Sequence, residues 1–67
     1  MTIDLEIGKV AGEIWQLLKE QGELSVSGVI SAVNASQSAA YMALGWLARE
    51  DKVIFERKSR GVFVRLK

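Results

Sequence analysis

The chain has 67 residues, a formal net charge of +1 at pH 7, and neither cysteine nor histidine. This composition excludes disulfide bonds, thiol nucleophiles and Cys/His zinc sites, and the length predicts one small domain over residues 1–67. No apolar stretch reaches the length of a membrane span and the N-terminus lacks the features of a signal peptide, so we expect a cytoplasmic protein with no membrane association. A core this small usually depends on very regular packing or on a partner subunit.

Charge is distributed unevenly along the chain. Residues 1–51 hold three basic and seven acidic side chains, whereas residues 52–67 hold six basic side chains and one acidic side chain. Within the acidic part, residues 24–48 carry no charge at all. The asymmetry indicates a basic tail suited to an anionic partner, and it leaves an uncharged middle whose surface needs a separate explanation.

The first predicted element is an amphipathic helix over residues 5–21. Asp4 is placed to cap its N-terminus, and Gly22 is a natural left-handed residue at its end. Apolar residues recur at the i, i+3 and i+4 spacing of one helix face: Ile7, Val10, Ala11, Ile14, Leu17 and Leu18.

Two further helices follow, joined by a tight turn. Ser25 precedes a short helix that we expect to end at a left-handed Asn34. Ser36 then caps a third helix over residues 37–50, and residues 34–36 form the turn between the two. One face of the third helix is predicted to enter the core through Ala40, Ala43, Leu44, Leu47 and Ala48.

The basic tail predicts two strands, over residues 53–55 and 62–66, because both runs are rich in β-branched and aromatic residues. Gly61 supplies the positive φ that a three- or four-residue hairpin loop with a bulge requires. Alternation puts Phe63 and Arg65 on one face and the neighbouring valines on the other, so both faces of the hairpin carry apolar side chains.

The order of helix, short extended piece, helix, tight turn, helix and basic hairpin is that of a winged helix-turn-helix domain. This is an α+β fold, mostly α, with three helices and a C-terminal β-hairpin wing. The segment 43–53, together with Gly8, Gly12 and Trp15 in the first helix, resembles a family of small, uncharacterised bacterial winged helix-turn-helix proteins. The resemblance implies the fold and no particular activity. We attribute the Gly8 and Gly12 spacing to close packing of helix against helix.

The third helix supports two interpretations. The first is weakly specific DNA contact, because an amide, hydroxyls and one guanidinium can reach a duplex; these groups belong to Ser36, Gln37, Ser38, Tyr41 and Arg49. The second is a protein interface through Met42 and Trp46, since aromatic residues and Met are enriched in interface cores and charge is depleted there. The sequence leaves both open.

The hairpin also supports two interpretations. Arg57, Lys58 and Arg60 surround its turn, and such a cluster binds a nucleic-acid backbone with release of counterions. Alternatively, these charges protect an exposed sheet edge from pairing with other molecules. Phe55 and Phe63 are predicted to pack in the core or in a dimer interface.

No nucleophile with a base, no carboxylate pair in a pocket and no metal-ligand set is recognisable, so we expect no enzyme, metal, cofactor or small-molecule ligand. The sequence therefore predicts a nucleic-acid-binding domain that contacts double-stranded DNA through its basic wing, in gene regulation and as a homodimer. The alternative is a protein-interaction module that kept the winged-helix scaffold without DNA binding.

Overall fold

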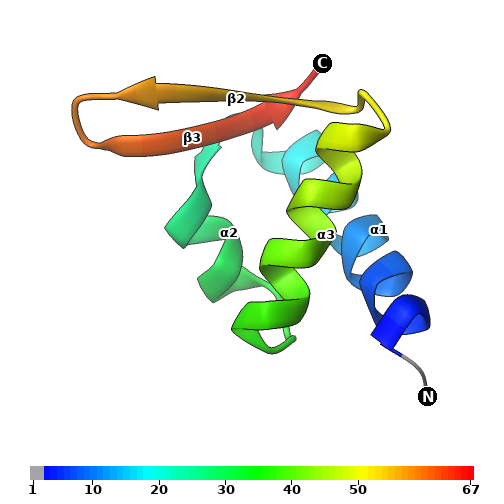
Figure 1. Cartoon of the computed structure of the whole chain (residues 1–67). Coiled ribbons are helices and arrows are strands. Elements are labelled where there is room, and N and C mark those ends of the chain that lie inside the picture. Colours follow the sequence, from blue (N-terminus) through cyan, green and yellow to red (C-terminus); the bar gives the residue numbers. More distant parts are fainter. Residues whose placement is uncertain (1–2) are drawn as a thin grey trace.

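The computed structural model describes residues 3–67, with side chains from residue 5 onward. The helices are α1 (Ile3–Gln21), α2 (Val26–Ala32) and α3 (Gln37–Arg49), and the strands are β1 (Leu24–Ser25), β2 (Val53–Lys58) and β3 (Gly61–Leu66). The strands form one antiparallel sheet in the order β1-β3-β2, which lies across one end of the helices (Figure 1). The predicted winged helix-turn-helix arrangement, α+β and mostly helical, is confirmed.

Helix α1 is the longest element and is longer at its start than predicted. Ile3 and Asp4 are already helical, so Asp4 lies inside the helix and is not its N-cap. The predicted end is correct: Gly22 has φ 78° and its N–H donates to the carbonyl of Leu18 at 2.8 Å. This left-handed residue closes the helix and turns the chain into β1.

Two serine caps define the helix-turn-helix. The Ser25 Oγ accepts from the N–H of Gly28 at 3.0 Å, and the Ser36 Oγ accepts from the N–H of Ala39 at 3.2 Å. The end of α2 differs from the prediction, because Asn34 does not have a positive φ. The helix ends instead at Ala32, and Val33 is its C-cap: the Val33 backbone is extended while its N–H still donates to the Val29 carbonyl at 3.1 Å.

The core lies where the buried faces of α1 and α3 meet α2 and the sheet. Two details concern the helix and strand faces: Ala48, which was predicted to enter the core, is exposed, and in β2 Val53 is buried whereas Ile54 is only partly buried. The sheet register explains the second, since Val53 pairs with Leu66 on the helix-facing side and Ile54 pairs with Arg65 on the outer side. The buried side chains are Val10, Ala11, Ile14, Leu18, Val29, Ala39, Ala40, Ala43, Leu44, Leu47, Val53 and Val64.

The β2–β3 hairpin forms the wing, and its strands are longer than predicted. They pair as far as Lys58 and Gly61, so the loop has two residues, Ser59 and Arg60, and the predicted three- or four-residue loop is wrong. Gly61 does carry a positive φ, of 133°. The chain enters the wing through Asp51, whose φ of 61° turns it from α3 into β2.

Candidate nucleic-acid interface

Helix α3 presents one continuous exposed stripe. Ser38, Met42, Gly45 and Arg49 are spaced by three or four residues, so they lie along one side of the helix, and all four are exposed. Tyr41, beside this stripe, is 54% exposed. Arg49 is the only charged residue in α3.

Tyr41, predicted for DNA contact, and Trp46, predicted for a partner interface, lie at opposite edges of this stripe. Trp46 borders a cleft that Gly8, Gly12 and Trp15 of α1 also line, so its edge faces α1. Tyr41 is five residues away, which is about 140° around the helix, and therefore lies at the edge away from α1. Since α1 and α2 flank α3 on opposite sides (Figure 1), this second edge faces α2.

Ser36 and Gln37 stand at the N-terminus of α3, and both are exposed. The Ser36 oxygen already accepts from the backbone of Ala39, so this hydroxyl caps the helix and has its hydrogen left to offer a ligand. Among the described residues the exposed Gln37 amide forms no side-chain hydrogen bond, and its geometry suits an adenine edge.

The far end of the wing projects beyond the helices (Figure 1). It carries the guanidinium groups of Arg57 and Arg60. Among the described residues, neither Arg57 nor Arg60 forms an ion pair, and both are exposed. Arg57 pairs with Val62 across the hairpin, and so belongs to the helix-facing side of the sheet with Val53, Phe55 and Val64. Arg60 lies in the turn itself.

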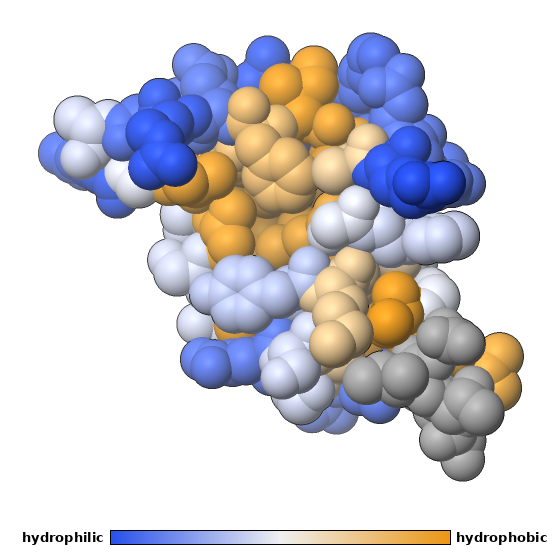
Figure 2. Space-filling model, in the orientation of Figure 1, coloured by the Kyte–Doolittle hydropathy of each residue, from blue (hydrophilic) through white to orange (hydrophobic). Residues whose placement is uncertain are grey.

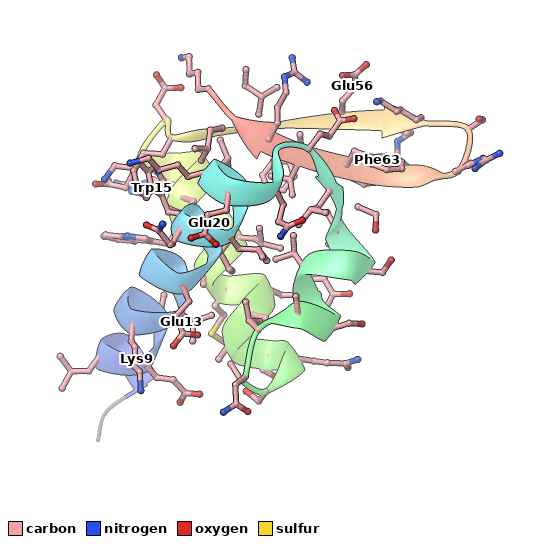
Figure 3. All side chains as sticks on the ribbon, turned by 180° about the vertical axis from the view of Figure 1, so that it is seen from behind. Lys9, Glu13, Trp15, Glu20, Glu56 and Phe63 are labelled. Atoms are coloured by element: carbon pink, nitrogen blue, oxygen red, sulfur yellow. The ribbon has the colours of Figure 1, made fainter. Side chains whose placement is uncertain are left out.

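Lys58 and Arg65 lie on the outer side of the wing, where acidic residues neutralise them. The Lys58 Nζ donates to the Glu23 Oε1 at 2.6 Å and stands 4.9 Å from the centre of the Phe63 ring. The Arg65 Nη1 donates to the Glu56 Oε1 at 3.0 Å and lies 3.7 Å from the Glu23 Oε2. Figure 3 labels Glu56 and Phe63 on the hairpin. The sequence did not lead us to predict a role for Glu23. Its negative charge, opposite to that of the basic wing, was the only signal available.

The four aromatic and Met residues predicted for a dimer interface do not form one surface. Met42 and Trp46 share the exposed side of α3, with 47% and 48% of their surface exposed. Phe55 pairs with Val64 and faces the helices, whereas Phe63 pairs with Glu56 on the outer side, beneath the Lys58 ammonium. A single flat interface can therefore include Met42 and Trp46 but not both phenylalanines.

The prediction that Gly8 and Gly12 allow close packing of α1 against another helix is wrong. A Cβ atom built at Gly8 or Gly12 meets nothing within 4 Å, and the same holds for Gly45 in α3. These three residues are exposed, so the contact between α1 and α3 does not require them. Gly8 and Gly12 line a shallow cleft together with Trp15 and Trp46.

The face of the molecule on which α3 is exposed has a hydrophilic and a hydrophobic region. Hydrophilic residues cover the projecting end of the hairpin, and hydrophobic ones gather between the hairpin and α3 (Figure 2). Among the described side chains, those of residues 5–67, no group of three or more from His, Cys, Asp or Glu could hold a metal ion. Over residues 3–67, no helix combines the length and hydropathy needed to cross a bilayer.

Comparison with known proteins agrees with this geometry. The family described as "Winged helix-turn-helix domain (DUF2582)" matches residues 1–66. The uncharacterized protein MJ1608 of Methanocaldococcus jannaschii is 37% identical over 65 residues, which cover 92% of this chain and 91% of that protein. The solution NMR structure of protein BT2368 from Bacteroides thetaiotaomicron matches with a TM-score of 0.83 and 34% identity, over 97% of this chain and 79% of that one. The chain therefore belongs to the winged helix-turn-helix family DUF2582.

Proposed function

We propose that this domain binds double-stranded DNA in the cytoplasm, in gene regulation, with its wing along the phosphate backbone and α3 toward the major groove. The observation that carries the proposal is the pair of exposed, unpaired guanidinium groups of Arg57 and Arg60 on the projecting end of the wing. Guanidinium groups match the geometry of phosphate oxygens, and nothing within the described chain competes for these two. The proposal includes no catalytic step.

The charge of each side chain indicates which part of the DNA it would contact. Arg57 and Arg60 neutralise phosphates at the wing, and Arg49 does so at the C-terminal end of α3. Ser36, Ser38 and Tyr41 are neutral donors that position the helix, and the Gln37 amide has the geometry to read a base. Lys58, which the sequence analysis included among the phosphate contacts, is engaged by Glu23. Binding is therefore weak and only slightly dependent on sequence.

The salt dependence of binding tests the proposal. Three phosphate contacts give a log-log slope of about −2.7, at about −0.9 for each contact. The double variant Arg57→Gln/Arg60→Gln should reduce the slope to about −0.9 in fluorescence anisotropy titrations with a mixed-sequence duplex. The matched control is Lys9→Gln/Lys19→Gln, which removes the same charge from α1; Lys9 is exposed on that helix (Figure 3). Equal slopes for the two variants would refute the wing as the binding surface.

A second candidate is self-association, with the domain acting as a protein-interaction module. The observation that favours it is the exposure of Met42 and Trp46 next to the open glycines of α1 and α3. Large apolar side chains beside a surface that allows close backbone approach suit a homodimer interface. Sedimentation equilibrium over a wide concentration range tests it: a mass that stays at 7.4 kDa throughout would exclude the homodimer.

A further inference from the structure

We infer that Glu23 is an internal anion that masks the outer side of the wing, so that nucleic acid is received only on the helix-facing side and at the tip. The inference rests on the proposed DNA binding and specifies which surface of the wing takes part. It makes Glu23 a positioning residue, because it acts through the wing cations and has no contact of its own with DNA.

Glu23 reaches both strands of the wing. One carboxylate oxygen accepts from Lys58 of β2 at 2.6 Å, and the other lies 3.7 Å from the guanidinium of Arg65 in β3. The carboxylate thus occupies the place between the two cations that a phosphate group would take. The three side chains remain 30% to 43% exposed, so the contact lies at the surface, where a ligand could compete for it.

The backbone around Glu23 holds it in position. The next two residues, Leu24 and Ser25, pair with Val64 and Phe63 of β3, which ties the turn after α1 to the edge of the sheet. The pairing therefore fixes the backbone of this turn next to the wing, where the carboxylate is within reach of both cations. A phosphate approaching the outer side has to displace an anion that is already in place.

Removal of the Glu23 charge releases one cation. Glu23 is the only acidic partner of Lys58 among the described residues, whereas Arg65 keeps its contact with Glu56. Glu23→Gln should therefore add one phosphate contact and make the slope more negative by about 0.9. With the contribution of the added contact set to zero at about 1 M salt, this slope corresponds to binding that is tighter by about 15-fold at about 50 mM salt and by about 4-fold at about 200 mM.

The experiment compares the salt dependence of five proteins, the parent and four variants, with one mixed-sequence duplex. Glu13→Gln is the matched control, because it removes the same charge from an exposed position of α1 that makes no contact with the wing (Figure 3). Lys58→Gln alone should leave the slope of the parent unchanged, since that lysine is masked. Glu23→Gln/Lys58→Gln should return the slope to the parent value. Amide spectra confirm that each variant is folded, as expected for an exposed ion pair that contributes little to stability.

The outcomes separate this inference from the proposed function. A steeper slope for Glu23→Gln than for Glu13→Gln supports masking. If the parent binds DNA and Glu23→Gln and Glu13→Gln have the same slope, masking is overturned and DNA binding stands. The same conclusion follows if Lys58→Gln alone makes the slope less negative than that of the parent. If only Glu23→Gln binds, masking stands and DNA binding by the native domain is overturned. Absence of binding by every variant overturns both.

Discussion

Replacement of Gly12 by alanine tests whether the surface beside α3 is open. Gly12 lies in the interior of α1, where glycine costs roughly 0.5–1 kcal/mol relative to alanine because it loses more backbone entropy on folding. A Cβ atom at this position meets nothing within 4 Å. Gly12→Ala should therefore stabilise the isolated chain by about 0.5–1 kcal/mol, with no clash to offset the gain.

The expected shift in melting temperature follows from the size of the chain. Unfolding entropy of about 2.1 cal/mol/K per residue amounts to about 0.14 kcal/mol/K for a chain of this length. The gain in stability then raises Tm by about 4–7 °C, which circular dichroism can resolve at low protein concentration.

Two other glycines provide controls of opposite sign. A Cβ atom at Gly28 would lie 3.0 Å from the Ser25 Oγ, the oxygen that caps α2, so Gly28→Ala should lower Tm. Gly61→Ala should also lower it, because a φ of 133° strains any residue with a Cβ atom. These controls show that the sign of the effect comes from the local environment and not from alanine itself.

A lower Tm for Gly12→Ala in dilute solution would refute the reasoning, because it would mean that something in the chain occupies this space. A gain in dilute solution that disappears as the protein is concentrated has a different meaning. It would show that a second copy approaches α1 closely enough for the added methyl group to interfere, as self-association through this surface requires.

Three further variants test the caps, the core and the exposed face. Ser36→Ala should cost about 1 kcal/mol in urea denaturation, because the N–H of Ala39 loses its acceptor; an unchanged midpoint would contradict the cap. Ile14→Ala should cost about 2–5 kcal/mol in the same assay, since this side chain is fully buried and leaves a cavity; a cost below the lower value would show that the core relaxes around it. Trp46→Ser should leave the stability of the monomer nearly unchanged and abolish any association seen in sedimentation, whereas retained association would place the interface elsewhere.

Local signals were sufficient to predict the elements of this fold. Ser25 and Ser36 act as caps because the capping bond joins residues three apart, a distance that sequence spacing describes directly. The left-handed residues were harder to assign. Asn34 and Asp51 belong to the two types most often found with positive φ outside glycine, yet only Asp51 adopts it. The helix α2 is already closed by Val33, whose backbone is extended, so its end does not require a left-handed Asn34.

The candidate site could be predicted less well, because its charges are set by contacts between distant parts of the chain. Lys58 and Glu23 are 35 residues apart, and nothing in the local pattern of either segment brings them together. Their contact depends on β1, a strand of two residues whose pairing with β3 places the end of α1 beside the wing. A strand that short carries no periodicity from which its pairing could be inferred.

The charge asymmetry of the sequence therefore suggests a larger positive charge on the wing than the folded structure leaves unpaired. Three of the six basic residues in 52–67 are paired with acids in the structure, and two of those acids, Glu23 and Asp51, come from the acidic first part of the chain. Folding brings the two oppositely charged parts together, and each neutralises some of the other. What remains for a polyanion at the tip of the wing is Arg57 and Arg60, and their position selects the side of the hairpin from which it approaches.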